Sequence, residues 1–83
     1  MECKILSSER EVFSGDVKGL FARGVEGWVG ILSGHAPAAF ALVDAPVRVV
    51  LEDGQRTFHV RNGLIDVRRK GAIVLGDEVV EVA

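Results

Sequence analysis

The sequence predicts an all-β domain, either a β-sandwich or a barrel, from three observations. Short runs rich in Val, Ile, Leu and Phe alternate with polar residues, which is typical of half-buried strands. Glycine-containing turn signals separate these runs about every 8–12 residues. Nowhere does an apolar i, i+3, i+4, i+7 pattern last long enough for a substantial helix. At 83 residues, the chain has the length of one small domain with a thin core.

The first half of the chain contains three short predicted strands. Residues 3–6 (CKIL) alternate between apolar and polar side chains, which indicates a strand. Residues 11–24 (EVFSGDVKGLFARG) are expected to form two more strands, with a bend at Ser14-Gly15. Residues 36–44 (APAAFALVD) leave helix and strand undecided on pattern alone, because the run is brief and has Pro37 near its start.

The second half carries the clearest strand pattern. Strands are expected over 47–52, 55–61 and 64–69, followed by 72–75 and 78–82. The dipeptides Asp53-Gly54 and Asn62-Gly63 separate the first three, and both accept the positive φ angles of a two-residue type I′ turn. We therefore expect an antiparallel meander. The side chains expected in the core are Val12, Phe13, Phe21, Phe40, Phe58, Ile65, Val67, Ile73 and Leu75.

Composition narrows the classes of function. The chain has 10 basic and 12 acidic residues, a net charge of −2, so it lacks the excess of basic side chains that nucleic acids attract. The single cysteine, Cys3, cannot form an internal disulfide and is expected in the core. A hydrophobic fraction of 48% is high for so small a domain, which suggests that some apolar surface meets a partner. The first residues do not resemble a signal peptide.

Residues 24–43 (GVEGWVGILSGHAPAAFALV) are unusual because they carry one charged side chain, Glu26, among four glycines and Pro37. The segment is too apolar for a solvated loop and too broken for a buried helix, and it is a poor candidate for a membrane span. We expect a soluble chain, or one that reaches a membrane only through a partner.

No pattern of catalytic or ligand-binding residues stands out. The sequence has no phosphate-binding loop and no dinucleotide fingerprint. Ser33 and His35 lie close together but lack the G-x-S-x-G nucleophile elbow. His35, His59 and Cys3 are too scattered in the sequence for a recognisable metal site. We therefore expect no catalytic residues, no cofactor, no metal and no nucleotide binding.

Residues 26–37 (EGWVGILSGHAP) closely resemble the signature E-G-x-x-G-I-L-P-G-H-A-P of the N-terminal domain of the ATP synthase epsilon subunit family. Two further stretches fit the same family at the right spacing, VFSGDV at 12–17 and NGLIDV at 62–67. Ser33 replaces the usual proline, which leaves the loop less rigid, and Asn62 replaces a usual glycine. The resemblance covers nearly the whole chain.

This resemblance implies a ten-stranded β-sandwich, or flattened barrel, of two five-stranded sheets, with residues 1–83 as a single domain. Such a domain lies in the central rotor stalk of an F-type ATP synthase and binds the gamma subunit and the membrane ring of c subunits. It performs no chemistry itself, and residues 36–43 are mainly extended. The family commonly continues into two alanine-rich helices. We expect a short or truncated member without that hairpin, so the inhibitory and ATP-sensing roles of those helices do not carry over.

The resemblance also implies site residues. Those on the ring side are Glu26, Trp28, Val29, Ile31 and Leu32. Those facing gamma or the ring are His35, Pro37, Ala38 and Phe40. The glycines expected to shape turns are Gly27, Gly30, Gly34, Gly54 and Gly63. The implied location is peripheral, on the cytoplasmic face of a bacterial plasma membrane or the equivalent face of an organelle membrane.

Two alternatives remain open on the sequence. The chain could be a free-standing module that binds a small ligand or peptide in a concave apolar pocket around Trp28 and His35. Trp28 itself could be a buried anchor of the core, in which case its replacement by alanine costs about 3–5 kcal/mol of stability.

Overall fold

A computed structural model describes residues 1–82 of the chain, and every regular element in that range is a β-strand. The strands are β1 (Glu2–Leu6), β2 (Glu11–Asp16), β3 (Gly19–Gly24), β4 (Gly27–Leu32), β5 (Ala38–Ala41), β6 (Ala45–Leu51), β7 (Gly54–Arg61), β8 (Leu64–Arg68), β9 (Gly71–Leu75) and β10 (Glu78–Val82). The strands expected in both halves are present. The undecided segment at 36–44 is extended, as the family resemblance implied, and contributes β5.

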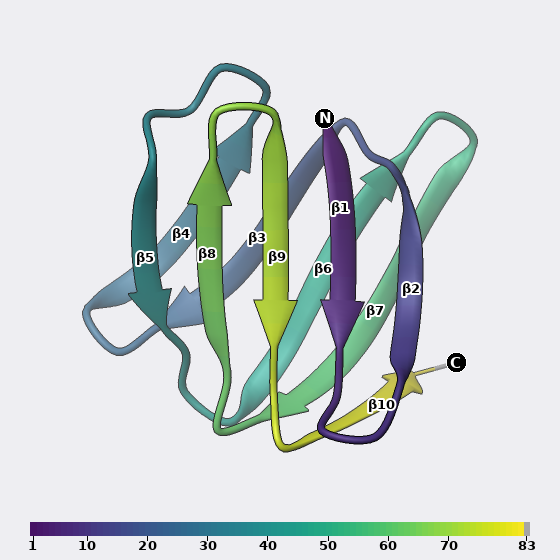
Figure 1. Cartoon of the computed structure of the whole chain (residues 1–83), viewed down its shortest axis with the longest axis vertical. Coiled ribbons are helices and arrows are strands. Elements are labelled where there is room, and N and C mark those ends of the chain that lie inside the picture. The colour runs from purple at the N-terminus through teal and green to yellow at the C-terminus, as the bar shows by residue number, and fades with distance from the viewer. Residues whose placement is uncertain (83) are drawn as a thin grey trace.

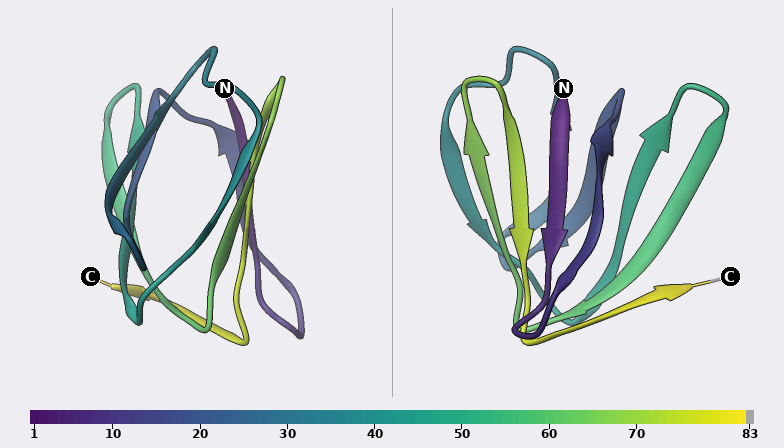
Figure 2. Two further views of the ribbon diagram at one scale, coloured as in Figure 1. Left: turned by 90° about the vertical axis from the view of Figure 1, so that its left-hand side faces the viewer. Right: turned by 45° about the vertical axis from the view of Figure 1, so that its right-hand side comes forward.

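The strands form two five-stranded sheets that pack face to face, as the edge-on view in Figure 2 shows. One sheet has the order β2-β1-β9-β8-β5 and the other β10-β7-β6-β3-β4 (Figure 1). The sandwich and its strand count are therefore confirmed, and the two sheets do not close into a barrel. Strands β1 and β9 are parallel, whereas the other pairs are antiparallel. Strands β4 and β5 are the sheet edges on one side of the sandwich, and β2 and β10 on the other.

The core is one apolar layer between the sheets, and every side chain buried in the described range is hydrophobic. The rings of Phe13 and Phe58 meet there with centroids 5.7 Å apart. The buried residues are Cys3, Ile5, Phe13, Val17, Leu20, Ala22, Ile31, Leu42, Val47, Val49, Phe58, Val60, Ile65, Val67, Ala72, Val74 and Val79. Val12 and Phe40 are half-buried and pack against this core, as expected. Three expected core residues are misplaced, because Leu75 is exposed and Phe21 and Ile73 are half-buried outside the core cluster.

Two predicted turns are wrong in ways that matter for the topology. Ser14-Gly15 lies inside β2, and the chain turns at residues 17–18 instead. Asn62-Gly63 does not close a hairpin, because β7 and β8 belong to different sheets. The predicted meander is therefore broken between β9 and β10, which also belong to different sheets, and at Asn62-Gly63, where the chain crosses from one sheet to the other.

The glycine at this crossing is required for close packing. A Cβ atom on Gly63 would lie 2.7 Å from Cγ1 of Val60 and 3.0 Å from Cδ1 of Leu42. Only Asn62 has a positive φ angle here, 51°, so the type I′ prediction is wrong. It is also wrong at Asp53-Gly54, where the expected β6–β7 hairpin does form but only Gly54 has a positive φ.

Arg56 connects the two sheets at the edge where β2 and β10 lie. The guanidinium of Arg56 lies 5.1 Å from the ring centroid of Phe13 and 5.4 Å from that of Phe58. It also donates two hydrogen bonds to Glu81, at 2.8 and 2.7 Å. These hydrogen bonds lower the pKa of the Glu81 carboxyl. The cation thus covers the end of the aromatic core and pairs with β10 at the same time.

We predict that Gly71→Ala strongly destabilises the domain. A Cβ atom at Gly71 would overlap the backbone carbonyl oxygen of Glu2, and the parallel pairing of β1 with β9 holds that carbonyl in place. The expected loss is about 3 kcal/mol, or a Tm lower by more than about 10 °C, measured by thermal denaturation. Gly15→Ala is the matched control, because its Cβ would make an ordinary 3.4 Å contact with Phe13. Equal melting temperatures for the two variants would contradict the proposed clash.

We also predict that Cys3 does not react with alkylating agents while the protein is folded. Its side chain is fully buried, and desolvation by burial raises the pKa of the thiol to about 11. The reactive thiolate is therefore scarce at neutral pH and has no access to solvent. Mass spectrometry after iodoacetamide treatment should show modification only in guanidinium chloride. Rapid labelling of the native chain would show that β1 opens.

Candidate protein interfaces

The hairpin of β3 and β4 carries the predicted ring-side residues. Arg23 lies directly opposite Trp28 in this hairpin, and Gly24 lies opposite Gly27. Gly27 has a φ of 130°, a conformation that favours glycine and allows the chain to turn tightly after Glu26. Because β4 pairs only with β3, its other edge is unpaired within the described residues.

Strand alternation divides the predicted residues between two faces. Trp28 is 77% exposed and Leu32 is 55% exposed, and both lie on the outer face of the sheet. Val29 is half-buried against the core, and Ile31 is completely buried. The assignment of Ile31 to an interface is therefore wrong. A side chain one position from Trp28 or Leu32 along an extended chain must point the opposite way.

A cavity of about 500 Å³ lies between the β3–β4 hairpin and β5. It brings together four of the predicted interface residues and the turn glycine Gly27. Its lining comprises Gly24, Val25, Glu26, Gly27, Trp28, Val29, Ala39, Phe40 and Ala41. His35 belongs to the following loop, where its Nδ1 lies 2.7 Å from the Ala36 carbonyl oxygen and its ring packs edge-on against Phe40. Both Pro37, in this loop, and Ala38, which begins β5, lie outside the cavity lining.

Two of the predicted turn glycines have different roles. Gly34 has a φ of 88° and shapes the β4–β5 loop as expected. Gly30, in contrast, is a strand residue in the middle of β4. A Cβ atom there would lie 3.0 Å from the ring of Phe21, so Gly30 allows this ring to lie across the outer face of the hairpin.

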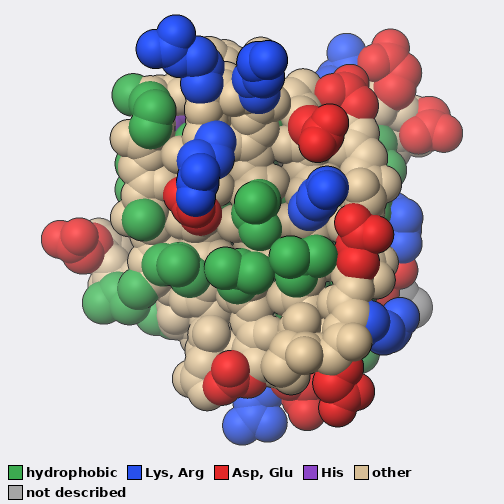
Figure 3. All heavy atoms as spheres, in the orientation of Figure 1, with side chains coloured by type: hydrophobic (Ala, Val, Ile, Leu, Met, Phe, Trp, Pro, Cys, Tyr) green, Lys and Arg blue, Asp and Glu red, His purple; other side chains and the backbone are tan. Residues whose placement is uncertain are grey.

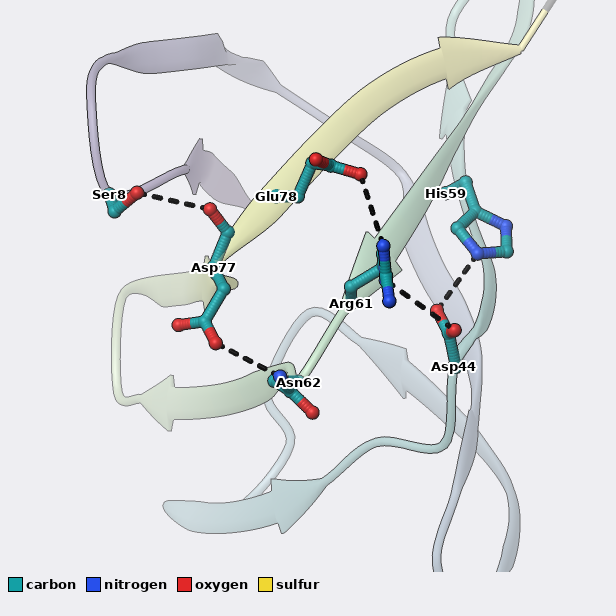
Figure 4. Close-up of polar contacts among 7 residues, drawn as sticks. All are labelled: Ser8, Asp44, His59, Arg61, Asn62, Asp77 and Glu78. Carbon is teal, nitrogen blue, oxygen red and sulfur yellow. Dashed lines mark hydrogen bonds and ion pairs between the residues drawn. The ribbon is translucent and has the colours of Figure 1, made fainter.

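Polar side chains gather at the corner where the chain crosses between the sheets (Figure 4). His59 Nε2 lies 2.9 Å from Asp44, and Arg61 lies 3.8 Å from Asp44 and 3.6 Å from Glu78. The other contacts are a 2.9 Å hydrogen bond from Asn62 to the Asp77 carboxylate and a 3.0 Å hydrogen bond from Ser8 Oγ to the Asp77 carbonyl. This corner joins β10 to β7 and to the loops beside them, which is a structural role. In residues 1–82, no group of His, Cys, Asp and Glu could hold a metal ion.

A second exposed apolar surface lies on the outer face of the other sheet. Four side chains lie in register across neighbouring strands, because Leu64 pairs with both Ala41 and Leu75, and Leu75 pairs with Leu6. We call Ala41, Leu64, Leu75 and Leu6 the apolar row. Figure 3 shows apolar side chains gathered in a band across this face. Leu64 and Leu75 are 38% and 40% exposed.

Sequence reasoning missed this row. It placed Leu75 in the core, in an apolar run at 72–75. The available signal was that Leu6 and Leu75 end strands whose neighbouring residues, Ile5 and Val74, already supply the inward positions. A strand with apolar side chains on both faces indicates a second covered face.

The exposed apolar surfaces indicate which class of protein this is. Exposed apolar side chains in registered groups are typical of interaction surfaces, and in residues 1–82 they occur on a β-sandwich with an entirely apolar core. The chain is therefore best described as an interaction domain. No helix in the described range is long and apolar enough to cross a membrane.

Comparison with known proteins identifies the family. The sequence model of the family described as "ATP synthase, Delta/Epsilon chain, beta-sandwich domain" matches residues 1–82. The chain belongs to this family. It is 42% identical over 77 residues to an ATP synthase epsilon chain from Chromohalobacter salexigens, covering 92% of this chain and 55% of that protein. It is 37% identical over 81 residues to one from Acinetobacter baumannii, covering 96% and 58%. The chain thus spans a little over half the length of these relatives.

Solved structures show the same fold at low sequence identity. A chain in the Euglena gracilis mitochondrial ATP synthase, in a structure of OSCP, F1 and the c-ring, has a TM-score of 0.88 at 20% identity, covering 95% of this chain and 51% of that one. A chain in the central stalk and c-ring of the Tetrahymena thermophila enzyme has a TM-score of 0.83 at 14% identity, covering 96% and 65%.

We predict that Trp28→Ala barely changes the stability of the domain. The core alternative for Trp28 does not fit a side chain that is 77% exposed. The melting temperature should stay within about 5 °C of the wild type. Trp28 is the only tryptophan, so acrylamide should quench the intrinsic fluorescence of the native protein nearly as well as that of the unfolded chain. A collapsed melting temperature would return Trp28 to the core.

Proposed function

We propose that this chain acts as the epsilon-type subunit of an F-type ATP synthase. In this role it is a non-catalytic part of the central rotor stalk, binds the gamma subunit and the c-subunit ring, and helps couple ion flow through the ring to ATP synthesis. One observation carries the proposal: a single small domain has two separate exposed apolar surfaces. A coupling component must hold two partners at once, and these surfaces suit that task.

The hairpin end is the better candidate for the ring contact. Trp28 and Leu32 project from the outer face of β4, Glu26 lies at the hairpin tip, and Val29 lines the cavity beside them. Exposed tryptophans commonly anchor interfaces because they bury a large area on contact. His35, Pro37, Ala38 and Phe40 continue this surface along the β4–β5 loop and β5, toward gamma or the ring.

The apolar row is the better candidate for the gamma contact. It crosses four strands of one sheet, which provides a broad face for a partner that turns together with this domain. Such a face has the apolar centre and charged surroundings that stable interfaces share. Lys4, Asp66 and Glu11 lie beside the row.

The proposed location follows from these partners. A rotor-stalk subunit is peripheral, on the cytoplasmic face of a bacterial plasma membrane or the equivalent face of an organelle membrane, and touches the membrane only through the complex. The coupling ion, a proton or sodium, is selected in the ring and not by this domain.

The cavity beside β5 supports one alternative, a module that binds a small ligand or peptide alone. Its volume of about 500 Å³ falls in the range of ligand pockets. In that case Trp28 and Phe40 would contact the ligand, and the apolar row would have no partner.

The decisive experiment tests the two surfaces separately. We predict that Trp28→Glu abolishes binding to the purified c ring but leaves binding to gamma intact, since a charge in a desolvated contact is costly. Leu75→Glu, at the centre of the apolar row, should do the reverse. Each variant should lower coupled ATP synthesis in reconstituted vesicles.

The matched control is Val80→Glu, which places the same charge on a side chain that is 56% exposed on β10. This variant should bind both partners as the wild type does. The proposal fails if wild-type chain binds neither partner, or if all three variants behave alike with unchanged melting temperatures.

A further inference from the structure

Two arginines lie over two aromatic rings, at cation–π distance, on the outer face of β3, β4 and β6. The guanidinium carbon of Arg23 lies 6.0 Å from the ring centroid of Trp28, and that of Arg48 lies 5.2 Å from the ring centroid of Phe21. Each pair lies directly across neighbouring strands. With Leu32 they form what we call the arginine–aromatic patch, defined by Phe21, Arg23, Trp28, Leu32 and Arg48.

The charges of this patch are unmatched within the described part of the chain. Neither Arg23 nor Arg48 forms an ion pair or a side-chain hydrogen bond with any residue in 1–82. Elsewhere in the same fold, Arg56 makes two short hydrogen bonds to Glu81. An arginine that lies over an aromatic ring and has no carboxylate partner keeps N–H groups free, and these match the oxygens of a carboxylate or a phosphate.

We infer that the arginine–aromatic patch binds carboxylate side chains of the partner that contacts Trp28. The inference rests on the proposed function, and it specifies the chemistry of the partner surface: Asp or Glu residues beside apolar side chains. The aromatic rings hold Arg23 and Arg48 before contact, which reduces the conformational entropy lost on binding. Trp28 and Leu32 then exclude water from the contacts.

A protein surface is a better partner for this patch than a lipid headgroup. Attraction to anionic membranes usually takes a cluster of about 4–8 basic residues, and the patch has two. The apolar side chains between the two cations suit a protein interface centre, in which Trp and Arg are enriched.

Charge removal provides the first test. The double substitution R23Q/R48Q should raise the Kd for the detergent-solubilised c ring with bound gamma by about tenfold at low salt and flatten its dependence on salt. R10Q is the matched control, because Arg10 is exposed in the β1–β2 loop of the sheet that does not carry the patch. The double variant and the control should both keep the wild-type melting temperature. An unchanged Kd for R23Q/R48Q would overturn the inference.

Zero-length cross-linking provides a second test that does not depend on affinity. A carbodiimide joins carboxylates to primary amines and does not join them to guanidinium groups. In the variants R23K and R48K, a new bond should therefore form between the introduced lysine and an Asp or Glu of the ring or gamma, identified by mass spectrometry. R10K should gain no such bond. Absence of a product at both patch positions, with the complex assembled, would contradict the inference.

The outcomes separate this inference from the proposed function. If wild-type chain binds the ring and gamma while R23Q/R48Q binds equally well, only the carboxylate contact is wrong. If wild-type chain does not bind them, the proposed function fails as well. Sedimentation with vesicles of phosphatidylcholine and phosphatidylglycerol in equal parts tests the lipid source. Binding by the wild type that R23Q/R48Q loses would overturn the inference in favour of a membrane contact.

Discussion

The structure depends on one thin apolar layer shared by two sheets. All side chains buried in residues 1–82 are hydrophobic, and the rings of Phe13 and Phe58 meet within that layer. A domain of this length buries a modest share of its surface, so nearly every inward position of every strand is needed for the core. Close approach of the backbone to a core side chain is part of the same constraint, since a Cβ at Gly63 or Gly76 would overlap Cγ1 of Val60.

Polar side chains lie on the surface, where they stabilise the edges of the apolar core. Arg56 covers the aromatic end of the core at the edge of β2 and β10, and the contacts of Asp44 and Asp77 secure the crossing between the sheets. Exposed ion pairs contribute little energy individually. Their value here lies in fixing the loops and edges that the core does not reach.

The exposed apolar side chains are not needed for the core. The inward positions alone are enough to form the core, so Trp28, Leu32, Leu64 and Leu75 are surplus to folding and are best explained by contacts with other molecules. They lie in two places, on the outer faces of different sheets. The core holds the two sheets, and therefore the two surfaces, in a constant relative orientation. The proposed coupling role requires that rigidity.

The sequence by itself determined the strands and the family, because strand alternation and a twelve-residue motif are local signals. Of the three turn dipeptides, only Asp53-Gly54 closes the expected hairpin. The sequence also placed Trp28, Leu32 and the cavity residues Glu26 and Phe40 in the candidate site. Only the tertiary structure decided that Asn62-Gly63 is a crossing between sheets, that Ile31 is buried and that Leu75 belongs to an exposed row. Alternation shows that a strand has two different faces, but which face is covered depends on strands distant in sequence. The parallel pairing of β1 with β9 is such a contact, and no local pattern encodes it.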